Sequence, residues 1–431
     1  MKLSDLLGGS DIFRRNVKRV LAAGILSQIV GLIALPILSR LFPPESFGAL
    51  TAFTLLQSIL LAFVTARLEW LVPNARNEVS ARRFLAAAFF ALLISTLLLY
   101  VLLMATWFSG FSFGRFDSAL EISEVVVVGA FLAGLFLILQ ACSVYANDLR
   151  AMSKAKVAQA VLTLCASLVL GYFAILDYGL IFAYVLGFFG AVALMKKEFL
   201  LLVDAVVKTP FRRALRVFSV YKRSIFASVS LSVVNVLFQS ILAVLIIFFY
   251  GAVVAGWYGL VYRVATAPIG LITTSVSRSF WAEAAQLVKK DPRKLRVFYI
   301  QSVKRLAVVS LPFAVVFLLG PLYVPSLFGA DQWGGAGEIL AALTPFLVGM
   351  IVFSPTTHLI VYKKAHWQLW VDAGTCVLAV LVFSVAFRFG QSPAVSTFLA
   401  SSVVLAGYIL RFAVHLRANS QLLRKREFAD L

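Results

Sequence analysis

Charged residues are scarce in this sequence. They make up 13% of the 431 residues, against 61% for hydrophobic residues, whereas a soluble domain is roughly 45–50% apolar and about 25% charged. The mean hydropathy is +0.95, and apolar runs of about 20 residues recur along the chain, each long enough to cross a hydrocarbon layer of about 30 Å as a helix. The composition therefore excludes a soluble globular protein and predicts a polytopic helical membrane protein.

Cysteine and histidine are also rare, with three of each. Cys142, Cys165 and Cys376 all fall inside apolar runs, which is typical of small buried hydrophobes rather than of disulfide or metal partners. The histidines are scattered along the chain rather than clustered. We therefore expect no disulfide, no metal site and no cofactor.

The formal net charge of +20 does not indicate a nucleic-acid partner. The basic residues form short clusters between apolar runs, and no soluble segment is large enough for a nucleic-acid-binding domain. Cytoplasmic loops that obey the positive-inside rule explain the clusters better. The sequence also lacks residue patterns typical of an enzyme: a His–Glu helix pair, a glycine-rich phosphate loop or a Ser–His–Asp set. We expect neither nucleic-acid binding nor catalysis.

Twelve apolar stretches are predicted to span the membrane. The first follows Arg14, Arg15, Lys18 and Arg19, a start that resembles a signal peptide. It continues to Leu41 without a cleavage site of small residues, so we expect an uncleaved helix. The predicted spans cover residues of about 18–41, 46–70, 82–108, 121–145, 156–175, 178–195, 223–249, 254–277, 303–323, 338–361, 367–387 and 394–416.

The distribution of charges predicts the topology. If the N-terminus lies in the cytoplasm, nearly all Lys and Arg fall in the tails, in the even-numbered connections or at their membrane edges. Only Arg40, Arg115 and Arg388 lie on the far side, and Arg67 and Arg263 remain inside spans. The positive-inside rule therefore favours two cytoplasmic termini.

The longest connection divides the chain into near-equal halves. We expect an N-terminal six-helix bundle over residues 1–195, a basic cytoplasmic linker over 196–222, and a C-terminal six-helix bundle with a basic tail over 223–431. The linker has apolar residues at irregular helical spacing. A helix lying on the anionic membrane surface and a linker with no role beyond topology both remain open.

A short internal match favours a repeat. Span two opens with "ESFGALTAF" (Glu45–Phe53) and span eight with "GWYGLVYRV" (Gly256–Val264), and each has an aromatic residue followed by glycine. With six spans per half, both halves enter the membrane from the same side, so the repeat is parallel about an axis along the membrane normal. The predicted fold is all-α, with twelve transmembrane helices in two six-helix bundles related by pseudo-two-fold symmetry.

Arg263 is the most informative residue inside a span. It lies about nine residues into span eight, or about 14 Å at 1.5 Å per residue. A charge so deep costs a few kcal/mol and faces a partner or a wet cavity, and snorkelling from that depth is difficult. We favour a place in a cavity wall. The alternative is an ion pair with Asp372 or Glu69, which are the carboxylates well within the predicted spans.

Arg67 and Glu69 lie near the inner end of span two. Two positions apart on a regular helix, they cannot pair face to face, so each needs its own partner or water. Anchoring at the membrane surface and a role in a cavity both remain open. Asp372 lies about one and a half turns inside span eleven, and it is either another anchor or the carrier of a coupling ion, H⁺ or Na⁺.

Four other residues are candidates for the cavity or for its motion. Asn235 and Gln239 share one face of span seven, where amides usually form interhelical hydrogen bonds and less often line a polar cavity. Pro268 and Gly270 interrupt span eight just past its arginine. Such breaks are tolerated beside a cavity, and we expect a hinge there. Tyr262, beside the arginine, points elsewhere on the helix and is expected to pack or to form an interfacial ring.

Four stretches carry a resemblance to a known family: "LPILSRLFPPESFGALTAF" (Leu35–Phe53), "ARLEWLVPNARNE" (Ala66–Glu78), "GWYGLVYRVATAPIGLITTSVSRSFWAEAA" (Gly256–Ala285) and "LFGADQWGGAGEIL" (Leu327–Leu340). Together they resemble bacterial polysaccharide flippases, the O-antigen and exopolysaccharide translocases of the multidrug/oligosaccharidyl-lipid/polysaccharide exporter (MOP) superfamily. The match covers both halves in order.

The resemblance implies a two-lobed protein of the bacterial cytoplasmic membrane with a central cationic cavity. Such proteins move an undecaprenyl-diphosphate-linked oligosaccharide to the outer leaflet by alternating access, as part of lipopolysaccharide or exopolysaccharide assembly. Glycan-assembly proteins are the partners it implies. Because arginine binds phosphate oxygens bidentately, Arg263 is the first candidate for the diphosphate, and Arg67 and Arg40 are weaker ones.

Two other functions remain open. A cation-coupled multidrug or metabolite extruder of the same superfamily would favour intramembrane carboxylates, of which this sequence has few. A membrane-embedded glycan polymerase or ligase would expose a sizeable far-side loop rich in catalytic acids or arginines, and the predicted far-side connections are short.

Overall fold

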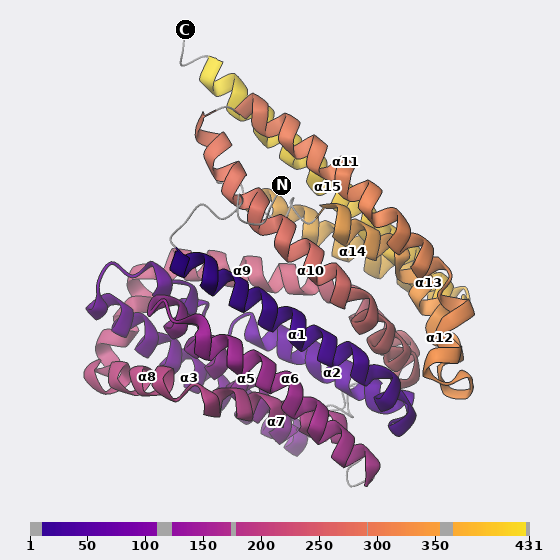
Figure 1. Cartoon of the computed structure of the whole chain (residues 1–431), viewed down its shortest axis with the longest axis horizontal. Helices are drawn as coiled ribbons and strands as arrows, with labels where there is room; N and C mark the ends of the chain where they lie inside the picture. Colours follow the sequence, from indigo (N-terminus) through magenta and orange to yellow (C-terminus); the bar gives the residue numbers. More distant parts are fainter. Residues whose placement is uncertain (1–10, 110–122, 174–177, 291, 354–364, 428–431) are drawn as a thin grey trace. The chain divides into compact units, whose positions relative to one another are not determined.

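The computed structural model describes residues 11–109, 123–173, 178–290, 292–353 and 365–427. Within these ranges the regular structure is helical and contains no β-strand. The chain divides into two compact units, Met1–Val236 and Leu237–Leu431, whose helices are coloured along the sequence in Figure 1. The prediction of an all-α protein is confirmed.

The first unit is a bundle in which two helices make most of the packing. α6 packs against α1 and α7, and α5 packs against α2, α3 and α7. The approach of α6 to α7 is very close, because a Cβ added to Gly187 of α7 would lie 2.0 Å from Thr163 Oγ1 of α6. The helices of this unit are α1 (Asp11–Leu41), α2 (Pro44–Leu61), α3 (Glu78–Ser109), α5 (Ser123–Tyr145), α6 (Leu149–Tyr172), α7 (Gly179–Leu194), α8 (Lys196–Lys208) and the first part of α9 (Phe211–Tyr250).

The second unit is organised around α13. This helix packs against α10, α11, α12 and α15, and α15 also packs against α14. Most side chains of α13 from Trp333 to Phe353 are buried. The helices are the rest of α9, α10 (Ala252–Lys290), α11 (Pro292–Leu318), α12 (Gly320–Phe328), α13 (Ala330–Phe353), α14 (Ala365–Arg388) and α15 (Pro393–Glu427).

Each of the twelve predicted spans overlaps one long helix. In the described part of the chain, eight helices are long and apolar enough to cross a membrane, or up to ten if each of two bent pairs counts as one span. Many of their large apolar side chains are exposed, such as Leu97, Leu311 and Leu381. A helix that is apolar all round is typical of a membrane span, so these surfaces fit contact with lipid.

Three helices of the second unit run past the predicted spans. α10 continues beyond residue 277, α11 begins before 303, and α15 continues beyond 416. Hydropathy marks the part of a helix that fits hydrocarbon, but a helix continues for as long as tertiary packing covers its apolar stripe. The packing here is a shared cluster of Phe280, Ala284, Leu295 and Tyr299, with Leu287, Phe298, Phe412 and Leu416 around it.

One cysteine prediction is wrong. Cys142 is buried and Cys376 is half-buried, but Cys165 is exposed on α6. An apolar run in a membrane helix has a side that faces lipid rather than protein, and so an apolar neighbourhood in sequence does not guarantee burial inside the bundle.

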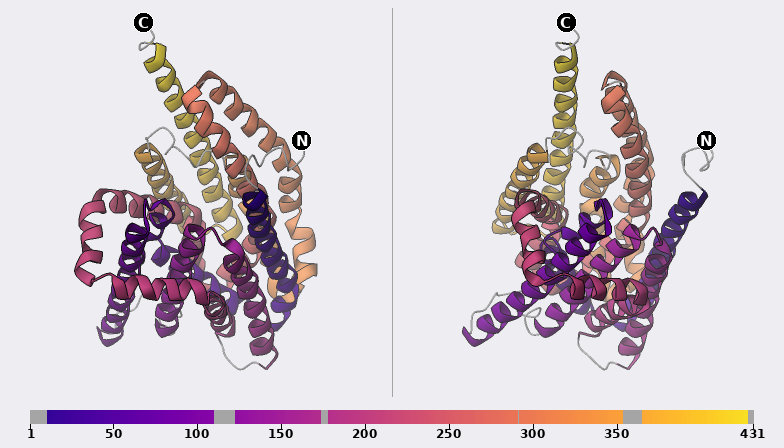
Figure 2. Two further views of the ribbon diagram at one scale, coloured as in Figure 1. Left: turned by 60° about the vertical axis from the view of Figure 1, so that its left-hand side comes forward. Right: turned by 90° about the vertical axis from the view of Figure 1, so that its left-hand side faces the viewer.

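The predicted basic linker is helical. α7 ends at Leu194 and α8 begins at Lys196 after a bend of 77°. α9 begins three residues after α8 ends. Both helices can be followed by their pink colour in Figure 2. The start of α9 packs on α3, where the rings of Phe211 and Phe90 meet edge to face at 5.0 Å. The first 26 residues of α9 belong to the first unit.

Connections that the charges predict to lie on one side of the membrane do meet in the first unit. Arg82, at the start of α3, lies 3.7 Å from Asp204 of α8. Ser143, near the end of α5, donates a hydrogen bond of 3.0 Å to Glu198 of α8. The second, fourth and sixth connections therefore gather at the same end of this unit.

Candidate functional site

The inner end of predicted span two is not helical. α2 ends at Leu61, and Ala66 and Arg67 both have left-handed backbone, with φ of 51° and 56°. Two short 3₁₀ helices follow, Leu68–Trp70 and Val72–Asn74. The prediction of one continuous span over 46–70 is therefore wrong. Its apolar residues pack into the core of the first unit instead, since Ala62, Val64, Leu68 and Val72 are all buried.

This break brings Arg67 and Glu69 together. Arg67 Nη1 lies 3.6 Å from Glu69 Oε1, and the two side chains are 14% and 4% exposed. We expected Arg67 and Glu69 to need separate partners because residues two apart on a regular helix point in different directions. The left-handed backbone at Arg67 breaks the helix and lets the two side chains meet. The guanidinium also lies over the ring of Trp70, 5.1 Å from its centroid, within the range of a cation–π contact.

The pair leaves polar atoms without ordinary hydrogen bonds. Within the described residues, both carboxylate oxygens of Glu69, the Arg67 Nε and the Thr65 hydroxyl are buried and lack a hydrogen bond of normal geometry. Buried polar groups are usually hydrogen-bonded, and paired non-glycine residues in left-handed backbone are uncommon. Strain of this kind is often found at ligand-binding or switching segments, which makes residues 65–70 a candidate site.

Arg263 lies on α10 in the second unit and is half-buried. The preceding residue, Tyr262, stacks on Phe346 of α13 at 6.3 Å and on Tyr258 at 5.3 Å, so the expectation that Tyr262 packs is confirmed. Each residue turns an α-helix by about 100°. Arg263 therefore lies about 100° from Tyr262 and on the opposite side from Val261 and Ala265, which are buried.

The two carboxylates that the sequence offers as ion-pair partners for Arg263 each have another arginine beside them. Glu69 pairs with Arg67. Asp372, on α14, pairs with Arg411 on α15, whose Nε donates a hydrogen bond to Asp372 Oδ1. The side chains of Arg411 and Asp372 are 1% and 0% exposed, respectively. Both carboxylates proposed as partners of Arg263 therefore have an arginine beside them.

Arg411 is a buried functional group that the sequence prediction missed. Its guanidinium carbon lies 3.8 Å from the centroid of the Phe238 ring and 5.3 Å from that of Tyr408. Charge counting assigned Arg411 to the membrane edge. The sequence did contain a signal for this pair. Asp372 lies five residues after the predicted start of span eleven, and Arg411 lies five residues before the predicted end of span twelve. These two span ends lie on the same predicted side of the membrane, so the two residues lie at the same depth on consecutive antiparallel helices.

The remaining predicted residues are spread over several elements. Arg40 is exposed in the last turn of α1, and on α9 Asn235 is half-buried whereas Gln239 is exposed. α10 passes through Pro268 and Gly270 without interruption. The proline lacks an N–H, so α10 lacks one hydrogen bond of its ladder there, and the hinge stays a prediction.

Comparison with solved structures defines the fold. The chain has the fold of the MOP-superfamily transporters. An inward-facing multidrug resistance MATE family transporter matches with a TM-score of 0.66 and 17% identity, over 94% of this chain and 95% of that one. The lipid II flippase MurJ in an inward closed conformation matches with a TM-score of 0.72 and 12% identity, over 94% and 89%. A MOP superfamily transporter from Pyrococcus furiosus, described as having a binding pocket of reverse polarity, matches with a TM-score of 0.62 and 17% identity, over 98% and 99%.

The family follows from the sequence. Residues 37–337 match the profile of the polysaccharide biosynthesis protein family, and the chain belongs to that family. No curated protein sequence matches it significantly. The resemblance drawn from the quoted stretches is confirmed at this level.

Proposed function

We propose that this protein moves an undecaprenyl-diphosphate-linked oligosaccharide from the inner to the outer leaflet of the bacterial cytoplasmic membrane by alternating access. Membership of the polysaccharide biosynthesis protein family supports a glycan-linked cargo. The likeness to the folds of solved transporters supports transport rather than catalysis.

The observation that carries this proposal is the state of the buried acids. Glu69 and Asp372, the carboxylates of the two polar sites, each lie beside an arginine. A transporter of organic cations needs a carboxylate that is free to meet its cargo, because an uncompensated cation is costly inside a membrane. Here both acids are already compensated by an arginine. This disfavours a cationic cargo and, together with the glycan-related family, favours an anionic one.

Arg263 is the residue that we propose binds the diphosphate. Arg263 lies in the first third of α10, away from the packed side that carries Val261 and Ala265, and it is half-buried. The planar fork can bind two phosphate oxygens at once. In this proposal the oligosaccharide follows a polar path while the polyprenyl chain stays in the bilayer.

Arg67 and Arg40 are weaker candidates for the same role. Arg67 is held by Glu69 and Trp70 at a strained turn, so it would have to exchange one of these contacts for a phosphate. Arg40 is exposed at the end of α1. For Asp372 and Glu69 we propose structural pairing first, because coupling through H⁺ or Na⁺ would require each acid to leave its arginine.

Flipping in liposomes tests the proposal. Purified protein would be reconstituted with a fluorescent undecaprenyl-diphosphate oligosaccharide, and the fluorophores in the outer leaflet would be destroyed with a membrane-impermeant reductant. We expect protein-dependent access to the inner-leaflet lipid with wild type, and a rate at least about tenfold lower for Arg263→Ala, since a charge-assisted bidentate contact contributes about 1.5–3 kcal/mol.

Controls separate a binding role from misfolding. Arg263→Lys keeps the charge but loses the fork, so its rate should lie between those of wild type and Arg263→Ala. Arg388→Ala, an exposed arginine at the end of α14, should leave the rate unchanged. Full flipping by folded Arg263→Ala would overturn the role of this residue. If wild type leaves the lipid in place but exports an organic cation along an ion gradient, the extruder function is correct instead.

A further inference from the structure

The surface of α8 divides into three sectors with different chemistry. Glu198, Leu202 and Ala205 are buried against the first unit. At about 100° per residue, the charged residues Lys197, Asp204 and Lys208 fall together on a second sector. The third sector is apolar and exposed, and it contains Phe199, Leu200, Val203 and Val207, of which Leu200 is 66% and Val207 78% exposed.

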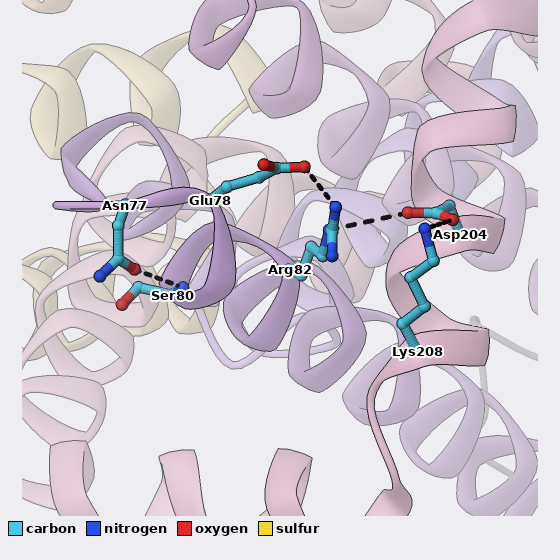
Figure 3. A network of polar contacts seen from close by, with 6 residues as sticks. All are labelled: Asn77, Glu78, Ser80, Arg82, Asp204 and Lys208. Carbon is cyan, nitrogen blue, oxygen red and sulfur yellow. Dashed lines mark hydrogen bonds and ion pairs between the residues drawn. The ribbon is translucent and has the colours of Figure 1, made fainter.

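The charged sector is fixed to α3. Asp204 lies between two cations, with Lys208 Nζ 2.6 Å from Asp204 Oδ1 and Arg82 Nε 3.7 Å from Asp204 Oδ2. Figure 3 shows Arg82 reaching Glu78 on its other side. The same figure shows Asn77, whose Oδ1 accepts a hydrogen bond of 2.9 Å from the Ser80 amide at the start of α3. The ion pairs therefore set the rotation of α8 about its own axis.

The position of α8 relative to the bilayer follows from its connection to α7. α7, which is strongly apolar, ends at Leu194, and α8 begins two residues later after a bend of 77°. α8 therefore starts where a membrane helix ends, and it runs across that helix rather than along it. A helix of 13 residues with five charged side chains is too short and too polar to cross hydrocarbon.

The basic residues around α8 supply charge complementarity to a lipid surface. Lys196 and Lys197 begin the helix, and Arg212, Arg213 and Arg216 follow on the first turns of α9, all exposed. Of the two acids in this stretch, Glu198 is buried and accepts a hydrogen bond from Ser143, and Asp204 is paired. The exposed charge is thus positive, beside an exposed apolar sector.

We propose that α8 and the first turns of α9 bind the anionic phospholipid surface of the membrane. The apolar sector enters the headgroup and upper acyl region, and the charged sector faces water. Lys196, beside the apolar sector, and the arginines at the start of α9 contact lipid phosphates. Amphipathic helices with apolar and basic faces lie in the membrane interface in this way. This inference concerns lipid and does not depend on the cargo of the transporter.

Spin labels on the full-length protein test the placement. Single cysteines at positions 203 and 207, in a chain whose three native cysteines are replaced by alanine, would be labelled in nanodiscs that contain phosphatidylglycerol. Accessibility to oxygen, which concentrates in lipid, would be compared with accessibility to a water-soluble nickel complex. We expect labels at 203 and 207 to be accessible mainly to oxygen, and a label at position 197, on the charged sector, mainly to nickel. Nickel accessibility at 203 and 207 equal to that at 197 would overturn the proposal.

A second measurement tests the preference for anionic lipid. Native mass spectrometry would compare binding of phosphatidylglycerol and phosphatidylcholine to the wild type, to Arg212→Gln/Arg213→Gln, and to the control Lys304→Gln/Arg305→Gln, which removes two exposed basic residues of the second unit. We expect the preference for phosphatidylglycerol to fall by about tenfold in the first variant and to stay near the wild-type value in the control. An equal fall in both variants, or in neither, would contradict a lipid site at α8.

Discussion

At the scale of single residues, the buried pair of Asp372 and Arg411 is the most sensitive point in the second unit. Both side chains are almost fully buried, and the arginine is sandwiched near the rings of Phe238 and Tyr408. Removal of one partner of a buried ion pair leaves an uncompensated charge, whereas replacement of both by apolar residues is often neutral or stabilising.

Arg411→Ala is therefore expected to destabilise the protein by about 3–5 kcal/mol. The double variant Asp372→Leu/Arg411→Met should recover most of that loss, because no buried charge remains. Thermal unfolding in detergent, followed by fluorescence, would measure both variants. A double variant that unfolds as early as the single one would contradict the pairing as the cause.

The left-handed backbone at Ala66 predicts a substitution that stabilises the protein. A left-handed conformation costs an L-residue roughly 1–2 kcal/mol, and glycine avoids most of this cost while losing about 0.5–1 kcal/mol in backbone entropy. We expect Ala66→Gly to raise the unfolding temperature slightly. Its matched control is Ala62→Gly, at a residue with φ of −67°, which should lower that temperature. Equal losses in both variants would show that residue 66 is not left-handed.

At the scale of elements, the contact of α6 with α7 depends on a glycine. A Cβ at position 187 would meet Thr163 Oγ1 at 2.0 Å and the Gln159 carbonyl oxygen at 2.9 Å. Small residues permit such close approach between membrane helices. The threonine side chain can turn away from an added methyl group, but a backbone carbonyl cannot, so the two helices would have to separate.

Gly187→Ala is expected to destabilise the protein by about 1–3 kcal/mol, the usual cost of overpacking a core. Gly374→Ala, on α14, has no heavy atom within 4 Å of the new Cβ and should stabilise its helix by up to about 1 kcal/mol. Thermal unfolding of the two variants side by side would test the contrast. A Gly187→Ala variant that unfolds at the wild-type temperature would mean that α6 and α7 lie farther apart than described.

The sequence predicted where the helices lie but not how each one ends. Apolar length is what hydrocarbon demands, so each of the twelve predicted spans overlaps a helix. Hydropathy does not register whether an apolar residue is covered by lipid, by a neighbouring helix or by a loop. For this reason residues 62–70 were predicted as helix, and the extensions around Phe280 and Tyr299 were not predicted.

The candidate site was predictable only in part, because pairing depends on helix neighbours. Arg263, Arg67, Glu69 and Asp372 stand out as charges in apolar surroundings. Their partners do not, since Arg67 reaches Glu69 only through a left-handed turn and Arg411 reaches Asp372 from a different helix. Depth from the span ends is a signal that would have indicated the second pair.

At the scale of the whole molecule, the sequence match between the two halves continues beyond the residues that open spans two and eight. The register that aligns Gly48 with Gly259 also aligns Arg67 with Arg278 and, three residues later, Trp70 with Trp281. The backbones of the two copies differ at this point, because α2 ends at Leu61 whereas α10 continues to Lys290. The repeat therefore keeps residue types while the local structure has diverged.

The meeting of the even-numbered connections predicts a labelling pattern. Single cysteines at positions 74 and 197, in a chain without native cysteines, should react with a membrane-impermeant maleimide in inverted vesicles but not in intact cells. A cysteine at position 388 should show the reverse. All three positions are exposed, so burial does not protect them. Reaction of positions 74 and 388 from the same side would contradict the topology predicted from the charges.

The two units share α9, and this has a mechanical consequence. Its 40 residues form one helix that begins in the first unit and ends in the second, and they include neither proline nor glycine, the residues at which helices most often kink. The segment that joins the two units is thus a regular helix rather than an irregular linker. A change in the angle between the units would therefore require this helix to bend, or the short turns at its two ends, near Pro210 and Gly251, to change conformation.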